Sequence, residues 1–224
     1  MIDVAKVVEY CDLLGSGTLV TLYMTFLSTF LAYLFGMPLG IILVITDRQH
    51  VLPRHRLNSV LGGIVNVMRS IPFIILLIAV IPFTRLVVGT SIGPSASVVP
   101  LAIGAIPFVA RMVEASVKEV DKGLIEAALA MGASPWQIIS KVMVPEATPS
   151  LILGVSITII TLIGYSAMAG VVGGGGLGDI AIRYGYYRYQ EDLMFLTIIL
   201  LIIIVQMVQS AGNYLSRRID KRQK

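Results

Sequence analysis

The chain alternates between five long apolar stretches and shorter segments that carry charges, prolines and glycines. A helix needs about 20 mainly apolar residues to cross a bilayer, and each stretch is of roughly that length. The stretches lie at about residues 19–46, 57–82, 96–112, 150–172 and 193–214. This pattern predicts an all-α integral membrane protein with five transmembrane helices, built as a single domain over residues 1–224.

Composition and charge indicate that lipid is the solvent of this chain. Only 13% of its 224 residues are charged and 56% are hydrophobic, whereas soluble domains carry roughly 25% charged residues. The net charge is +4, and the densest basic cluster is the C-terminal RRIDKRQK, which directly follows the last apolar stretch. A basic cluster in this position is typical of a cytoplasmic membrane anchor, so the expected contact is membrane lipid and not nucleic acid.

The distribution of lysine and arginine predicts the orientation. The connection after the first stretch, the segment 121–149 and the C-terminus are assigned to one side of the membrane. Of the 17 lysines and arginines, thirteen fall on this side and four on the other. The four are Lys6, Arg85, Arg183 and Arg188. Because basic residues favour the cytoplasmic side, we expect the N-terminus outside, and the C-terminus and the segment 121–149 in the cytoplasm.

The segment between the third and fourth stretches is too polar to enter lipid, and it contains helix signals. Asp121 can cap a short helix at about residues 122–131, and Gly132 stands where a left-handed residue would end that helix. Four apolar residues recur at helical spacing and are expected to face the protein. They are Leu124, Ile125, Ala128 and Leu129.

A second short helix is predicted directly after the first. Ser134 is its cap, Pro135 is its first residue, and Gln137 completes a capping box. Pro145 and Pro149 are expected to separate this helix from the fourth span. From these residues alone, the segment is either a docking element or an ordinary cytoplasmic loop with short helices.

The segment resembles the cytoplasmic signature of ABC importer permeases. Glu126, Ala127 and Ala128 match its Glu-Ala-Ala, and Gly132 falls six residues after the glutamate, as in the signature. The end of the signature, isoleucine-x-leucine-proline, is replaced conservatively by Val-x-Val-Pro at residues 142–145. The resemblance implies cytoplasmic coupling helices between spans three and four. Through them, Glu126, Ala127, Ala128 and Gly132 would contact a separate ATPase subunit.

Other stretches resemble the methionine-importing subfamily. They are RSIPFIILL from Arg69, ARMVEASVKEV from Ala110 and YSAMAGVVGGGGLG from Tyr165. In that subfamily, the helix that corresponds to the fourth span lines the central pathway. The resemblance therefore implies that Met168 lines the substrate pathway or gate, together with its neighbours Tyr165 and Ser166. From the residues alone, the glycines and hydroxyls of this span are interpreted as helix-packing groups.

Arg69 is a charged residue inside an apolar stretch, and two interpretations are open. Intramembrane charge often marks function, which would make Arg69 a pathway or gate residue. Alternatively, its long side chain reaches the cytoplasmic interface and is followed by a kink at Pro72. The sequence favours the second interpretation. A mainly uncharged pathway suits a neutral or zwitterionic solute better than a bare ion.

Residues for catalysis, nucleotide binding or metal binding are not grouped in the sequence. No G-x-x-x-x-G-K-[ST] occurs, and GGGGLG at residues 173–178 lacks the lysine and the hydroxyl, so we expect these glycines to turn the chain or to pack closely. His50 and His55 share a basic loop without a third ligand, and Cys11 is the single cysteine. The sequence therefore predicts a transporter subunit and not an enzyme, without cofactor or metal.

The predicted function is that of the permease subunit of an ATP-driven ABC importer in the bacterial inner membrane, with methionine as the expected substrate. Five spans form a thin wall, so we expect a two-fold homodimer that presents its coupling helices to two ATPase subunits. The solute would arrive on an external substrate-binding protein. Three alternatives stay open: an importer of another amino acid, a non-transport membrane scaffold, and a secondary transporter.

Overall fold

The computed structural model describes residues 4–48 and 50–220, and every regular element among them is helical, which confirms the predicted all-α class. Two π-helical turns, Ile139–Met143 and Ala181–Tyr186, continue from α7 and from α9. The α-helices are α1 (Val4–Ile45), α2 (His55–Arg69), α3 (Phe73–Ala79), α4 (Ile81–Val88), α5 (Pro94–Lys118), α6 (Lys122–Ala130), α7 (Pro135–Ile138), α8 (Val144–Val171), α9 (Gly176–Ile180) and α10 (Glu191–Ile219).

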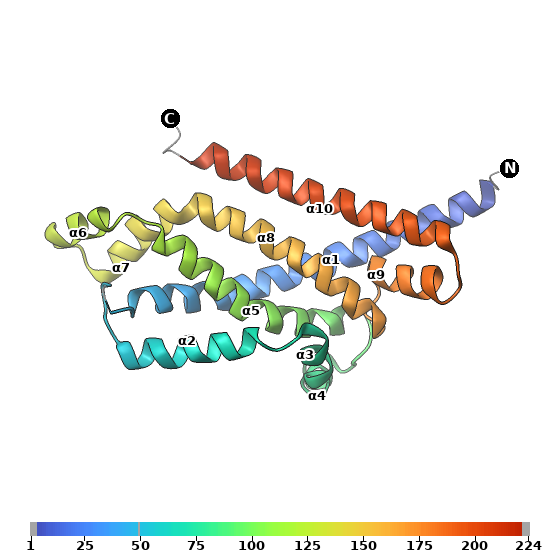
Figure 1. The fold of residues 1–224 in the computed structure, drawn as a ribbon, viewed down its shortest axis with the longest axis horizontal. Helices are drawn as coiled ribbons and strands as arrows, with labels where there is room; N and C mark the ends of the chain where they lie inside the picture. The colour runs from blue at the N-terminus through green and yellow to red at the C-terminus, as the bar shows by residue number, and fades with distance from the viewer. Residues whose placement is uncertain (1–3, 49, 221–224) are drawn as a thin grey trace.

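The long helices α1, α5, α8 and α10 run along the longest axis of the molecule, and α2 lies beside one half of this bundle (Figure 1). We call the end that holds α6, α7 and the start of α2 the α6 end, and the opposite end, with α9 and the start of α10, the α9 end. Buried residues of α1, α5 and α8, such as Met24, Leu101 and Leu162, belong to one hydrophobic core that also reaches α6. The bundle therefore holds α6 against its own core.

Four helices are individually long and apolar enough to cross a membrane, counted over the described residues: α1, α5, α8 with the turns before it, and α10. The predicted second span differs. It is a pair of helices, α2 and α3, bent by 98° at the break between them. The bend follows from Pro72, which lacks an N–H and disfavours helical backbone at Ile71. The count is five spans only if this bent pair is taken as one.

Helices α1 and α5 pack closely through two glycines of α1. A Cβ atom at Gly40 would lie 2.6 Å from the carbonyl oxygen of Ala110, and one at Gly36 would lie 2.8 Å from the carbonyl oxygen of Ile106. These glycines stand four residues apart, so both lie on the face of α1 that meets α5. Without side chains there, the two backbones approach closely, as is common for small residues four apart in membrane helices.

The second short helix of the segment 121–149 is not separated from the fourth span, and this prediction was wrong. Helix α7 passes into the π-helical turn Ile139–Met143 and then into α8, so that Pro135–Val171 forms one candidate span. Pro145 stands in the first turn of α8, directly after the change of hydrogen-bond register. The ring of Pro145 and its lack of an N–H are tolerated there, because the wider π turn changes the backbone hydrogen bonds that proline would otherwise interrupt.

The glycines at residues 173–178 turn the chain and pack closely, as predicted. Three of them have a positive φ, at Gly173, Gly175 and Gly176. At Gly178, a Cβ atom would lie 2.7 Å from the carbonyl oxygen of Ala167, so α9 contacts α8 backbone to backbone. This turn closes the α9 end of the bundle and lets Leu177 pack fully buried.

Candidate functional site

The predicted caps of α6 and α7 are confirmed. The carboxylate of Asp121 accepts a hydrogen bond from the backbone N–H of Gly123 at 2.6 Å, at the start of α6. Gly132 follows α6 in the left-handed region, with φ 77°. At α7, the hydroxyl of Ser134 accepts from the N–H of Gln137, and the Gln137 side chain accepts from the N–H of Ser134. These local bonds set the angle between the two short helices.

The inner face of α6 is narrower than the sequence predicts. Ile125 and Ala128 are buried and belong to the main core, together with Ile138 and Ile139 from the following turns. Leu124 and Leu129 were also expected to face the protein, but they are 45% and 47% exposed. At 100° per residue, each lies about 70° from the centre of the buried face, so the nine-residue helix presents them along its flanks.

The outer surface of α6 and α7 is apolar and exposed. Met131 is 82% exposed and Trp136 is 73% exposed. We define the α6 face as Leu124, Leu129, Met131 and Trp136 with the exposed Glu126 and Ala127 between them. Large apolar side chains gathered on one exposed surface mark a protein interaction site more often than a solvated one.

Four residues predicted for coupling lie in this segment, on different sides of α6. Glu126 and Ala127 are exposed on its outer surface, whereas Ala128 is buried against the core. Gly132 is exposed at the turn, where its N–H donates to the carbonyl of Leu129. Of the four residues, Glu126 and Ala127 are therefore accessible on the outer surface, whereas Ala128 packs against the core and Gly132 forms the turn after α6.

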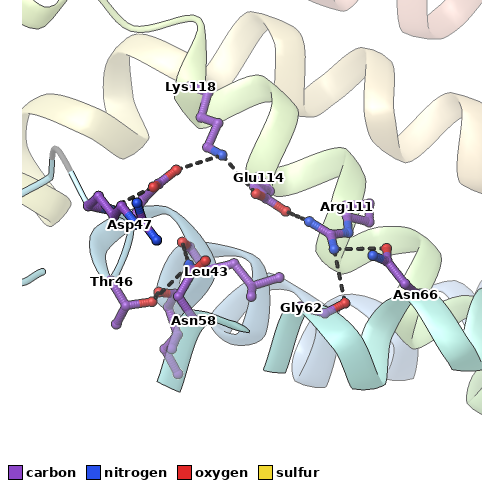
Figure 2. Close-up of polar contacts among 11 residues, drawn as sticks. Leu43, Thr46, Asp47, Asn58, Gly62, Asn66, Arg111, Glu114 and Lys118 are labelled. Carbon is purple, nitrogen blue, oxygen red and sulfur yellow. Dashed lines mark hydrogen bonds and ion pairs between the residues drawn. The ribbon is translucent and has the colours of Figure 1, made fainter. Parts of the chain in front are cut away.

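A charged network at the α6 end joins three helices (Figure 2). Glu114, which is 8% exposed, accepts from Arg111 at 2.5 Å and from Lys118 at 2.9 Å on the same helix, α5. The Lys118 ammonium also lies 3.0 Å from the carboxylate of Asp47, just past the end of α1. One buried carboxylate thus holds two cations, and one of these cations fastens the end of α1.

The same network reaches α2 through Arg111. Its guanidinium donates to the carbonyl of Gly62 at 3.0 Å and to the side-chain oxygen of Asn66 at 2.8 Å, as Figure 2 shows. One turn before Gly62 on the same side of α2, the amide of Asn58 donates to the carbonyl of Leu43 at 2.6 Å. Helix α2 is therefore bound by polar contacts to both α5 and α1, close to the start of α6. Sequence reasoning missed this network, although the spacing of Arg111, Glu114 and Lys118 on one helix face was a readable signal.

The two histidines of the connection between α1 and α2 have different surroundings. The ring of His55 is exposed and lies 2.8 Å from the guanidinium of Arg48. The Nδ1 atom of His50 is buried and has no hydrogen-bond partner among the described residues. Among the residues that the structure describes, no three histidine, cysteine, aspartate or glutamate side chains are grouped so that they could hold a metal ion.

Acidification is expected to weaken this connection. Burial lowers the pKa of His50. The negative charge of Asp47 raises it in part, and the positive charges of Lys118 and Lys122 lower it further. Below the unfolded value of about 6.5 the unfolded chain therefore binds more protons than the folded one, and stability falls. The hydrogen bond from Lys118 lowers the pKa of Asp47. The stability that ionised Asp47 contributes is present above about pH 4, and it is lost as the pH falls through the pKa of Asp47 in the folded protein.

The check is the thermal midpoint of the purified protein between about pH 8 and pH 5. His50→Gln should flatten the pH dependence near pH 6, and the exposed His55→Gln should leave it as in the unchanged chain. Equal curves for the unchanged chain and His50→Gln would show that His50 does not carry the effect.

The three residues predicted for the pathway lie near the α9 end of α8. Tyr165 stacks on Phe73 of α3, with ring centroids 4.4 Å apart and planes within 4°. Ser166 is buried, and its hydroxyl donates to the carbonyl of Ile163. Met168 is 46% exposed. The structure thus places Tyr165 beside the bend between α2 and α3 and Met168 on the surface, and it turns Ser166 into the protein.

Comparison with known proteins identifies close relatives over nearly the whole chain. A probable D-methionine transport system permease protein from Vibrio cholerae is 53% identical over 211 residues, which cover 94% of each chain. A methionine import system permease protein from Bacillus subtilis is 45% identical over 181 residues, which cover 81% of this chain and 82% of that one.

Solved structures give the same result. A chain of the MetNI methionine ABC transporter, crystallised in an inward-facing conformation, superimposes with a TM-score of 0.92 at 49% identity, covering 93% of this chain and 97% of that one. An amino acid ABC transporter, at 22% identity and a TM-score of 0.78, shares the fold. Residues 16–221 match the family described as binding-protein-dependent transport system inner membrane component. The chain therefore belongs to this family of inner-membrane transport proteins.

Proposed function

We propose that this chain is the permease subunit of an ATP-driven importer of methionine. The observation that carries the proposal is the α6 face, an exposed apolar surface on two short helices with hydrogen-bonded caps. The sequence of the same chain contains no nucleotide-binding motif. Relatives named for methionine transport are similar over nearly their full length, which supports the same substrate. ATP hydrolysis then takes place on a partner chain.

The α6 face is the proposed contact with that ATPase. Its exposed Met131 and Trp136 would fill a cleft in the partner, with Glu126 and the small Ala127 between them. Interfaces of this kind owe most of their affinity to a few buried aromatic and large apolar residues. Ala128 and Gly132 act as positioning residues, because they set how α6 lies on the core.

A two-fold pair of this chain is the proposed transport unit, with one ATPase subunit on each copy. Identical chains assemble most often with closed two-fold symmetry. Met168 and Val171, 46% and 55% exposed on α8, offer apolar surface that a second copy can cover. In such a pair Met168 lines or gates the pathway, with Tyr165 and Ser166 behind it, and an external binding protein delivers the solute at the α9 end.

The proposed orientation puts the α6 end in the cytoplasm and the N-terminus outside. Within the described residues, the α6 end gathers the basic residues of the connection between α1 and α2, of the end of α5 and of the end of α10. Basic residues next to membrane spans favour the cytoplasmic side. This orientation also places the α6 face where ATP is present.

The test is purification of the chain from a strain that co-expresses an ABC ATPase subunit and a substrate-binding protein from the same source. Uptake is then measured in proteoliposomes. We expect the ATPase to copurify and to drive accumulation of radiolabelled methionine when ATP is supplied on the α6 side. A panel of other amino acids separates methionine import from import of another amino acid. Uptake without any ATPase would indicate a secondary transporter, and copurification without uptake of any amino acid would indicate a scaffold.

Gly132 should tolerate substitution in a graded order. A Cβ atom there meets nothing within 4 Å, so the cost comes only from φ 77°. Left-handed backbone costs a side chain about 1–2 kcal/mol, least for asparagine and most for a β-branched residue. We expect Gly132→Asn to retain ATPase copurification, Gly132→Ala to weaken it and Gly132→Val to weaken it most, together with uptake.

The matched control is Gly63→Ala, which lies on α2, where a Cβ atom also meets nothing within 4 Å but the backbone is helical. It should leave copurification unchanged. If Gly132→Val retains full copurification and full ATP-driven uptake, the turn does not position α6 for the partner.

A further inference from the structure

Arg69 lies too far along α2 to reach the α6 end. It is the last residue of this helix, fourteen residues after His55, which corresponds to about 21 Å at 1.5 Å per residue. Its side chain is exposed, and its guanidinium makes no hydrogen bond or ion pair with any residue that the structure describes. The interpretation favoured from the sequence, an arginine that reaches the cytoplasmic interface, therefore does not fit the length of α2.

Carboxylates that could neutralise Arg69 are absent from the parts of the chain at its depth. The sequence contains no acidic residue between Asp12 and Asp47, between Asp47 and Glu114, or between Glu146 and Asp179. Glu114 already holds Arg111 and Lys118. The same stretches of a second copy of the chain likewise contain no acidic residue. Because an unpaired charge inside a membrane is costly, an arginine kept there without a partner points to a ligand.

A pocket of about 170 Å³ opens beside Arg69, where α2 bends into α3. Its walls come from the end of α2, from α3, from the middle of α5 and from α8. They include Met68, Arg69, Phe73, Gly104, Phe108 and Tyr165. The volume is below the roughly 300–1,000 Å³ of pockets for drug-sized ligands, so the pocket suits a single small molecule and excludes a peptide.

The walls divide into one cation and a group of aromatic and thioether side chains. The guanidinium of Arg69 matches a carboxylate through paired N–H donors. Phe108 and the stacked pair Phe73 and Tyr165 offer ring faces that attract an ammonium group and contact sulfur favourably. No acidic side chain lines the pocket to bind a cationic side chain.

We propose that this pocket binds an amino acid with an uncharged side chain during its passage through the permease. Arg69 binds the carboxylate, and the apolar or thioether side chain lies against Met68, Phe108 and the Phe73–Tyr165 stack. The inference rests on the proposed import of an amino acid and adds a site for it within the membrane-spanning part. Since the pocket is built across the bend between α2 and α3, a change in that bend changes its walls.

The test measures ligand protection of a thiol in the pocket, with the full chain purified together with its ATPase. A Cys11→Ser background removes the only cysteine of the sequence, and Ile71→Cys places a thiol at a half-buried position in the pocket wall. The rate of alkylation by a small neutral maleimide is measured with L-methionine, with D-methionine and with methioninamide. Methioninamide is the matched probe, because it differs only in lacking the carboxylate.

We expect methionine to slow alkylation and methioninamide, at the same concentration, to leave it unchanged. Arg69→Gln should weaken the apparent affinity for methionine about ten- to a hundredfold through loss of a charge-assisted hydrogen bond, whereas Arg69→Lys should retain part of it. Arg85→Gln on α4 is the control, since Arg85 is exposed and lies outside the pocket. Equal protection by methionine and methioninamide, or protection unaffected by Arg69→Gln, overturns the proposal.

Uptake measured on the same preparations distinguishes failure of the pocket proposal from failure of the proposed function. A complex that transports methionine but shows no carboxylate-dependent protection rejects the pocket and retains the importer. If the complex transports a different amino acid, the same protection is measured with that amino acid and its amide. A complex that transports no amino acid rejects the importer, and the pocket as a transport site with it.

Discussion

Glu114→Gln is expected to destabilise the protein by about 1–3 kcal/mol and to weaken coupling to the ATPase. Breaking a fully buried ion pair costs about 3–5 kcal/mol. The side chains of Arg111 and Lys118 are 25% and 41% exposed, so solvent screens part of that cost. Glutamine keeps the shape and accepts one hydrogen bond, but it leaves two cations without their shared counter-charge. The thermal midpoint should fall by about 3–10 °C.

The coupling effect follows from the position of the network. Lys118 ends α5 four residues before α6 begins, and it also contacts Asp47 at the end of α1. Loss of Glu114 therefore loosens the joint between α6 and the helices that would transmit its movement. We expect ATP hydrolysis by the purified complex to continue while methionine accumulation per ATP falls.

Glu119→Gln is the matched control, because Glu119 is the next acidic residue and is exposed at the end of the same helix. It should shift the midpoint by less than about 2 °C. Combining Glu114→Gln with Lys118→Met should cost less than the sum of the two single changes, because both remove the same ion pair between Lys118 and Glu114. Additive costs in this cycle would show that the two residues are not energetically linked.

The segment 121–149 was predictable in detail because its structure is local. Asp121, Gly132 and the Ser134–Gln137 capping box act on backbone groups within three residues, so the sequence alone determines them. The same reasoning failed at Pro145. Its expected effect as a helix breaker depends on the register of the hydrogen bonds before it, and the π-helical turn changes that register.

Features that depend on distant contacts were not predictable. The pairing of Arg111 with Asn66 and Gly62 joins residues 45 and 49 positions apart, and no local pattern specifies such a pairing. The pocket beside Arg69 needs α2, α3, α5 and α8 to meet at one bend. The sequence indicated only an unusual arginine followed by a proline, which left its role open between interface and pathway.

Substituting both Gly36 and Gly40 with alanine is expected to separate α1 from α5 and to abolish assembly of a stable permease. At Gly40 the new methyl group would lie 2.6 Å from the carbonyl oxygen of Ala110 and 2.7 Å from the Cβ of Val113. A backbone oxygen cannot rotate away as a side chain can, so the helices themselves have to move. Overpacking of this kind costs about 1–3 kcal/mol at each site, which exceeds the gain of about 1 kcal/mol from replacing glycine in a helix.

Gly15→Ala is the internal control for this pair, because Gly15 lies on the same helix and a Cβ atom there meets nothing within 4 Å. It should leave the thermal midpoint unchanged or raise it slightly. Val113→Gly added to Gly40→Ala, compared with Val113→Gly alone, distinguishes the two contacts at this site, because glycine also removes the Cβ atom of Val113. It removes the side-chain clash and leaves the clash with the carbonyl of Ala110, so we expect little recovery of the midpoint. Full recovery would mean that side-chain packing, and not the approach of the two backbones, sets the distance between α1 and α5.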